Sequence, residues 1–140
     1  MPRRVFVSFD YENDRRYKYL LEAWNANPEF TFVFQDILPE EINSYNVGRV
    51  KAALTAKINT ATHTFVIVGR YANAPHKDAY LIGSKNWINF EIKQSKVNGN
   101  KLVAIKLDRN YESPDELIGA RASWAMSFTE DAILEALRRA

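Results

Sequence analysis

The chain lacks the residues on which several common kinds of site depend. It has no cysteine and only two histidines, His63 and His76, among its 140 residues. Disulfides and thiolate metal sites are therefore excluded, and a zinc site is not expected. We predict no metal, and we expect His63 to be a strand residue that is packed or partly exposed.

Long hydrophobic runs are also missing. No apolar stretch approaches the roughly 18 residues that a membrane-spanning helix needs. The start of the chain turns polar at Asp10, which is too early for a signal peptide. We therefore expect a cytosolic protein that does not contact a membrane.

Charge of one sign is not concentrated anywhere in the sequence. The net charge is +2, and lysines and arginines alternate with acids without forming a polybasic block. Binding to nucleic acid or to a membrane surface is therefore not indicated. With 46% hydrophobic and 26% charged residues, the composition is that of an ordinary globular protein, and we expect one domain spanning 1–140.

The sequence motifs of several nucleotide and cofactor sites are absent. There is no GxxxxGK[ST] loop and no GxGxxG after the first predicted strand, which excludes an ordinary P-loop or dinucleotide site. A flavin-phosphate loop rich in Thr and Gly is missing from the same position. The third predicted strand ends in Gly69 and Arg70, where a receiver domain needs a phospho-accepting aspartate, and no Ser-His-Asp set can be assembled. We predict no cofactor.

Predicted strands alternate with predicted helices along the chain. Hydrophobic patterning predicts strands at 4–9, 30–34, 62–68, 102–107 and 123–128. It predicts helices at 13–25, from about 47 to 58, from about 84 to 98 and at 129–138, with a long loop at 70–85. This alternation predicts an α/β fold, in which helices cover both faces of a central parallel sheet of about five strands.

Such a sheet binds its ligand beyond the carboxyl ends of its strands, at the point where the strand order reverses. The segments that follow the predicted strands there are 9–11, 35–37, 69–71 and 106–108. The helix that contains Glu91 also begins at this edge. The sequence therefore predicts that separate segments meet in one crevice.

Glu91 has an unusual position on its predicted helix. At about 100° per residue, with Trp87 at zero, Glu91 lies near 40° and Ile88 near 100°. The acid is thus inside the apolar arc, whereas Lys93, Lys96 and Asn89 occupy the remaining arc. A carboxylate rarely faces a core unless it is paired or has a task. Glu91 is either a structural acid bonded to a buried donor or a functional acid.

The order of these motifs resembles the TIR-like domains of bacterial Thoeris anti-phage defence, of the ThsB type. The resemblance covers nearly the whole chain and is carried by residues 8–14, 32–36, 64–69, 84–92 and 99–105. Its most specific part is the WxxxE spacing of Trp87 and Glu91, preceded by a strand that ends in Gly69.

This resemblance implies a flavodoxin-like TIR fold and an enzyme that cleaves NAD at the nicotinamide–ribose bond. NAD would be the substrate rather than a cofactor. The product would be a cyclic or conjugated ADP-ribose signal that activates a separate effector protein. The resemblance further implies self-assembly into a homo-oligomer and a phage-derived trigger.

The resemblance also implies roles for particular residues. It predicts Glu91 as the catalytic residue, and as substrate-binding residues Phe9, Asp10, Asp36, Ser84 and Trp87. A structural alternative accompanies four of the latter: Asp10 as a helix N-cap or loop hydrogen-bond acceptor, Asp36 as a solvated loop acid, Ser84 as the N-cap of the Glu91 helix, and Trp87 as a core residue.

Other functions remain open at this stage. One is a non-catalytic TIR-type module that assembles through its loops, and a weaker one is a receiver-like regulator. The loop at 71–83 looks long, and we expect Tyr80, Leu81 and Ile82 to be exposed there. We predict that this loop binds substrate or a neighbouring subunit.

Overall fold

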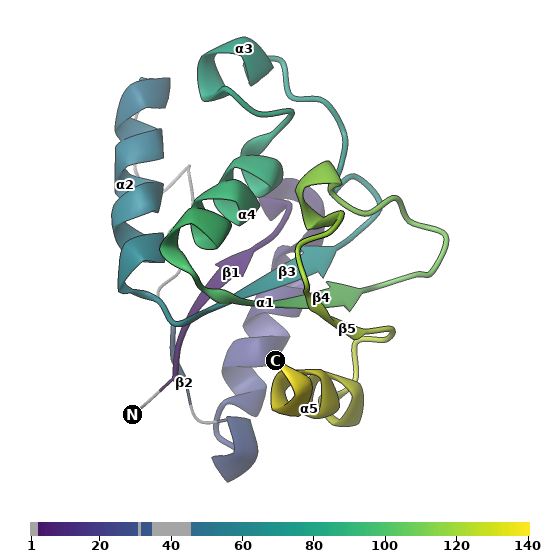
Figure 1. Ribbon diagram of the computed structural model, residues 1–140. Coiled ribbons are helices and arrows are strands. Elements are labelled where there is room, and N and C mark those ends of the chain that lie inside the picture. Colours follow the sequence, from purple (N-terminus) through teal and green to yellow (C-terminus); the bar gives the residue numbers. More distant parts are fainter. Residues whose placement is uncertain (1–2, 31, 35–45) are drawn as a thin grey trace.

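The computed structural model describes residues 3–30, 32–34 and 46–140. Figure 1 shows strands alternating with helices along this part of the chain. The elements, in chain order, are β1 (Arg3–Ser8), α1 (Tyr11–Trp24), η1 (Pro28–Phe30), β2 (Phe32–Phe34), α2 (Val47–Thr60), β3 (His63–Val68), α3 (Ala79–Ile82), α4 (Trp87–Asn98), β4 (Lys101–Lys106), η2 (Asp115–Leu117), β5 (Ser123–Ala125) and α5 (Glu130–Arg139). Within the described residues, no helix is both long and apolar enough to cross a bilayer.

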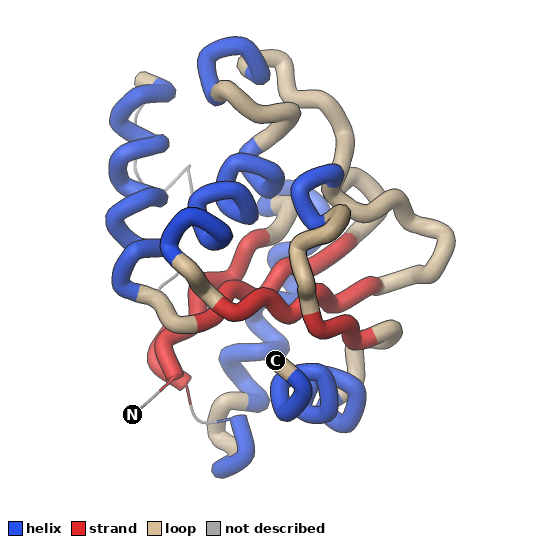
Figure 2. Tube along the Cα trace, in the orientation of Figure 1, coloured by secondary structure: helices blue, strands red, loops and turns tan. Residues whose placement is uncertain are grey.

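The strands form one sheet in the order β2-β1-β3-β4-β5 (Figure 2). Every pairing is parallel, with Val5 of β1 opposite Phe34 of β2 and also opposite His63 of β3. This is the flavodoxin-like strand order, in which the connections reverse direction between β1 and β3. The predicted α/β fold with a five-stranded parallel sheet is confirmed.

Side-chain alternation along β1 assigns its residues to two apolar layers. Val5 and Val7 belong to the layer that includes Leu21 of α1 and residues of α5. Phe6 points to the opposite face and packs with residues of α2 and α4. Ser8 has the same parity as Phe6, so it also faces α4. Helices therefore cover both faces of the sheet, as Figure 1 shows.

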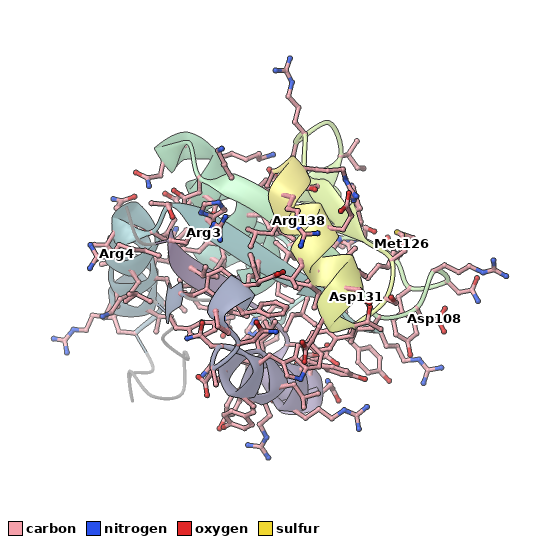
Figure 3. The ribbon with its side chains drawn as sticks, turned by 90° about the horizontal axis from the view of Figure 1, so that it is seen from below. Arg3, Arg4, Asp108, Met126, Asp131 and Arg138 are labelled. Carbon is pink, nitrogen blue, oxygen red and sulfur yellow. The ribbon has the colours of Figure 1, made fainter. Side chains whose placement is uncertain are left out.

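The amino and carboxyl ends of the strands lie at opposite ends of the sheet. Viewed from below in Figure 3, Arg3 and Arg4 at the start of β1 lie at the opposite end of the sheet from Asp108 and Met126, which follow β4 and β5. Because every pairing is parallel, the carboxyl ends of all five strands lie at the same end of the sheet as Asp108 and Met126. The segments after β1 and β3, and the start of α4, meet there.

Some predicted elements differ from the observed ones. The predicted loop at 70–85 contains a short helix, α3, which has only four residues and is too short to show periodicity. Phe30 belongs to a 3-10 turn rather than to β2, and the fifth strand ends at Ala125. Of the residues expected to be exposed, Tyr80 and Leu81 are 95% and 60% exposed, but Ile82 is 1% exposed because it packs in the core beside α2 and α4.

Candidate active site

Glu91 lies on the face of α4 that packs against the sheet. It is only 5% exposed. Ser8, the last residue of β1, donates a hydrogen bond from its Oγ to Oε1 of Glu91 at 2.7 Å. Each side chain reaches the other because strand parity turns Ser8 toward α4 and helix phase turns Glu91 toward β1. The prediction that Glu91 faces the interior is confirmed, and Ser8 is the buried donor that the structural interpretation required.

The environment of Glu91 favours its neutral form. Burial raises the pKa of Glu91 to about 8, and the hydrogen bond from Ser8 opposes this rise. Desolvation disfavours a charge that has no counter-ion. Among the ion pairs of the described residues, none includes Glu91. Near neutral pH the carboxyl group is therefore mostly protonated, and a positive charge brought beside it would favour ionisation.

A cavity of about 440 Å³ opens beside Glu91, within the usual range for small-molecule sites. It is lined by residues from the segment after β1 and the start of α1, from the segment after β3, and from α4 with its cap. These are Phe9, Asp10, Tyr11, Glu12, Asn13, Tyr71, Ala74, Pro75, His76, Asn86, Trp87, Ile88 and Glu91. The cavity lies at the reversal of strand order between β1 and β3, where the sequence predicted a crevice.

The segment after β1 forms one wall of this cavity. Asp10 is the N-cap of α1: its Oδ1 accepts from the Glu12 backbone N–H at 3.1 Å, and its Oδ2 accepts from Asn13 Nδ2 at 2.7 Å. The structural interpretation of Asp10 is therefore confirmed. Phe9 is half-buried, with its ring 6.5 Å from that of Tyr11. Phe9 and Asp10 both line the cavity, and their contact with substrate stays a prediction.

Trp87 packs against the core and also lines the cavity, which are the surroundings expected of a core residue and of a substrate-binding residue. Its ring packs edge-on against Phe90 at 5.8 Å and against His76 at 6.4 Å. It lies at the border of the apolar cluster under α2 and α4, and it also lines the cavity one turn before Glu91. Trp87 therefore joins the core to the cavity wall.

Ser84 does not have the predicted structural role. The N-cap of α4 is Asn86, whose Oδ1 accepts from the Asn89 backbone N–H at 2.8 Å. Asn86 can do this because its Nδ2 is held by the carbonyls of Ala72 and Ala74, at 2.8 and 2.9 Å. The capping prediction for Ser84 is wrong. Ser84 is half-buried, and it is not among the described residues that line the cavity.

Three buried asparagines connect the segment after β3 to α4, and sequence reasoning missed them. Asn89 donates from Nδ2 to Asn73 Oδ1 at 3.0 Å, and Asn73 donates from Nδ2 to Asp115 Oδ1 at 3.0 Å. The helical phase predicts Asn89 outside the apolar arc of its helix, but the residue is 2% exposed. Together with Asn86, these amides fix the cavity wall through hydrogen bonds, which leave no signal in a hydrophobic pattern.

A second buried acid, Asp14, directly follows the cavity-lining residue Asn13 in the chain. Asp14 of α1 is 6% exposed, and its Oδ2 has no hydrogen-bond partner among the described residues. Burial, with a smaller contribution from the charge of Asp10, raises the pKa of Asp14 to about 6. Its carboxylate occupies the space over Gly69 at the end of β3, so a Cβ at Gly69 would overlap it.

The remaining site predictions concern Asp36 and metal binding. Asp36 lies outside the described residues, as does the rest of segment 35–45. Its predicted role stays a prediction. In the described part of the chain, no group of three or more histidine, aspartate and glutamate residues could hold a metal ion.

The fold and the site together define a class of protein. It is a small flavodoxin-like α/β protein in which a buried carboxyl group faces a cavity at the reversal of strand order. The family described as Thoeris protein ThsB, TIR-like domain, matches residues 6–112. The chain belongs to this family, and the resemblance seen in the sequence is confirmed.

Solved structures of other proteins share the fold at low sequence identity. A CMP N-glycosidase, BcmB, from Clostridium botulinum is 12% identical, with a TM-score of 0.57 over 99% of this chain and 100% of that one. A 2-deoxyribosyltransferase from Leishmania mexicana is 10% identical, with a TM-score of 0.59 over 99% and 98%. A prokaryotic SEFIR domain is 15% identical, with a TM-score of 0.53 over 98% and 94%. No curated protein matches the sequence.

Proposed function

We propose that this protein cleaves NAD at the bond between nicotinamide and ribose. The observation that carries the proposal is the buried Glu91, held by Ser8 at the wall of the cavity. When the C1′–N bond breaks, its electron pair moves to the pyridinium nitrogen, and neutral nicotinamide leaves. The positive charge that develops on the ribose ring is stabilised by a nearby carboxylate.

The other cavity residues suit this reaction. Trp87 and Phe9 offer aromatic surfaces for a flat ring. Water, or a hydroxyl group of the same or another ribose, attacks C1′, forms the new C1′–O bond and loses its proton to solvent. Hydrolysis gives ADP-ribose, whereas attack by a hydroxyl group gives a cyclic or conjugated product. NAD is consumed as substrate, and the proposed reaction uses no further cofactor.

Two similar structures support an enzyme of this kind. They belong to proteins named as a CMP N-glycosidase and a 2-deoxyribosyltransferase, so in other proteins this fold carries N-glycosidase and deoxyribosyl-transfer chemistry. Membership of the Thoeris ThsB family supports a role in anti-phage defence. In that role the ADP-ribose-derived product activates a separate effector, and a phage component triggers a self-assembled form of the enzyme.

One observation favours a second candidate function, that of an assembly module without catalysis. Tyr80 and Leu81 on α3 are 95% and 60% exposed, and adjacent exposed apolar side chains mark protein contacts. This function predicts self-association in light scattering that the double change Tyr80→Ser and Leu81→Ser abolishes, without nicotinamide release under any condition.

The test is incubation of concentrated protein with NAD, followed by chromatography and mass spectrometry of the products. The proposal predicts nicotinamide release by the wild type and none by Glu91→Gln. The mass of the second product separates hydrolysis from cyclisation and conjugation. An untriggered enzyme is silent, so lysate from phage-infected cells is added in a parallel series. Silence in that series as well would overturn the proposal.

A further inference from the structure

The walls of the candidate active site carry an unusual balance of charge. Three acids line the cavity, namely Asp10, Glu12 and Glu91, and no lysine or arginine lines it among the described residues. Arg15 lies over the ring of Tyr11, with its guanidinium carbon 5.2 Å from the ring centroid, and is not a lining residue.

The start of α1 disfavours a phosphate group, and the cap of α4 already uses one of the backbone N–H groups at the start of that helix. The positive end of a helix binds phosphate through free backbone N–H groups. At α4, the Asn89 N–H is already taken by Asn86. At α1, the Glu12 N–H is taken by Asp10, and Glu12 and Asp14 add acids to the first turn. These acids would repel a phosphate group placed there.

The same walls suit a flat organic cation. Five aromatic rings line the cavity, those of Phe9, Tyr11, Tyr71, His76 and Trp87. Aromatic faces attract cations, and they do so more strongly where water is displaced. His76 accepts a hydrogen bond at Nδ1 from the Asp78 backbone N–H at 2.9 Å, so a neutral His76 ring carries its proton on Nε2.

We propose that the cavity selects the cationic N-ribosyl pyridinium half of its substrate, and that free nicotinamide riboside binds and is cleaved there without any phosphate or adenosine. The cleavage step rests on the proposed function, whereas the selection for a cation rests on the cavity alone. The phosphate-bearing half of NAD then lies outside this cavity. The bond that breaks is the same C1′–N bond, and its electron pair again leaves with nicotinamide.

Binding of a cation should release a proton, because Glu91 is mostly protonated in the empty site. A cation held beside the carboxyl group stabilises its ionised form, so binding releases a proton. The other groups that face this region are the Ser8 hydroxyl on β1, the acids Asp10 and Glu12, and His76. The buried Asp14, which follows Asn13 in the chain, has a lower pKa of about 6.

The experiment compares nicotinamide riboside with dihydronicotinamide riboside, an uncharged analogue of nearly the same shape, by calorimetric titration of the wild type. We expect the affinity for nicotinamide riboside to rise about fivefold between pH values of about 6.5 and 7.5. Proton release should appear as an enthalpy that depends on the buffer. The uncharged analogue should bind at least about tenfold more weakly, without this pH dependence, and ADP-ribose should not displace nicotinamide riboside.

Two variants complete the test. Glu91→Gln should still bind nicotinamide riboside but lose the pH dependence, whereas Asp131→Asn, at an exposed position on α5, should behave as the wild type. Equal binding of the charged and uncharged ribosides, or displacement by ADP-ribose, would overturn the proposal.

Nicotinamide release from NAD and from nicotinamide riboside is measured in the same samples. If the pH signature is present and neither compound is cleaved, the selection for a cation stands, but the proposed function fails. If NAD is cleaved and nicotinamide riboside does not bind, the proposed function stands and the inference about the cavity is wrong.

Discussion

The substitution Glu91→Gln should stabilise the fold increasingly as the pH rises. In the unfolded chain the carboxyl group loses its proton near its ordinary pKa of 4.5, but in the folded protein it keeps the proton until the pH reaches about 8. Between these values the folded state holds a proton that the unfolded state has released. Raising the pH therefore favours unfolding of the wild type. Glutamine cannot ionise, so the variant does not lose this stability.

The magnitude follows from the difference between the two pKa values. Each pKa unit corresponds to about 1.4 kcal/mol, so the shift from 4.5 to about 8 amounts to about 5 kcal/mol above pH 8 as an upper value. The buried amide of glutamine adds an N–H₂ group, which costs about 1–3 kcal/mol if it finds no acceptor. That cost does not depend on pH, so the pH dependence of the difference is the informative quantity.

Urea denaturation of both proteins at pH values of about 5.5, 6.5 and 7.5 measures this quantity. The free energy of unfolding of Glu91→Gln, minus that of the wild type, should increase by about 1.4 kcal/mol per pH unit. The raised pKa of Asp14 affects both proteins equally and cancels in the difference. A difference that stays constant over this range would refute the claim that Glu91 is buried without a counter-ion.

Three further substitutions test contacts around the cavity. Ser8→Ala removes a hydrogen bond that lowers the pKa of Glu91 and should raise that pKa by about one unit in a carbon-13 NMR titration. Gly69→Ala should destabilise the fold by about 1–3 kcal/mol, and Asp14→Ala, by removing the overlapping carboxylate, should relieve most of this cost in a double-mutant cycle; additive effects would exclude the overlap. Asn86→Ala should cost about 2–3 kcal/mol and should speed amide exchange in α4 and the preceding segment, while unchanged exchange would show that its hydrogen bonds do not hold this wall.

The sheet and the position of Glu91 could be predicted from the sequence because both follow from periodic burial. Alternating strands and helices determined the order of elements, and the helical phase of Glu91 relative to Trp87 placed the acid toward the core. The identity of its donor could not be obtained in this way. Ser8 is 83 residues away, and only the packing of α4 on β1 brings the two side chains together.

The wall made by the asparagines could not be predicted for a different reason. Ser84 and Asn86 are both short polar residues just before α4, and either type can cap a helix. Asn86 is selected because its amide also binds two carbonyls of the segment after β3. Such hydrogen bonds depend on the path of a loop, which leaves no periodic trace in the sequence.

The buried acid connects stability to the proposed function. A buried carboxyl group without a counter-ion destabilises the fold near neutral pH. The fold tolerates such a group, Glu91, at the wall of a cavity. The positive charge lies on the pyridinium ring of a bound substrate and moves onto the ribose as the bond breaks, and it would provide the missing counter-ion. Glu91 would then catalyse the step by stabilising the ribose cation of the transition state more strongly than the pyridinium of the bound substrate, which is the condition for catalysis.

The pH dependence of kcat/KM for NAD, measured by nicotinamide release under the conditions that activate the protein, tests this account most directly. This ratio reports ionisations of the free enzyme. It should increase with pH and level off near the pKa of Glu91, which is about 8. Glu91→Gln should show no release at any pH. A ratio that does not change through this range, or release by Glu91→Gln equal to that of the wild type, would contradict the assignment of Glu91 as the catalytic residue.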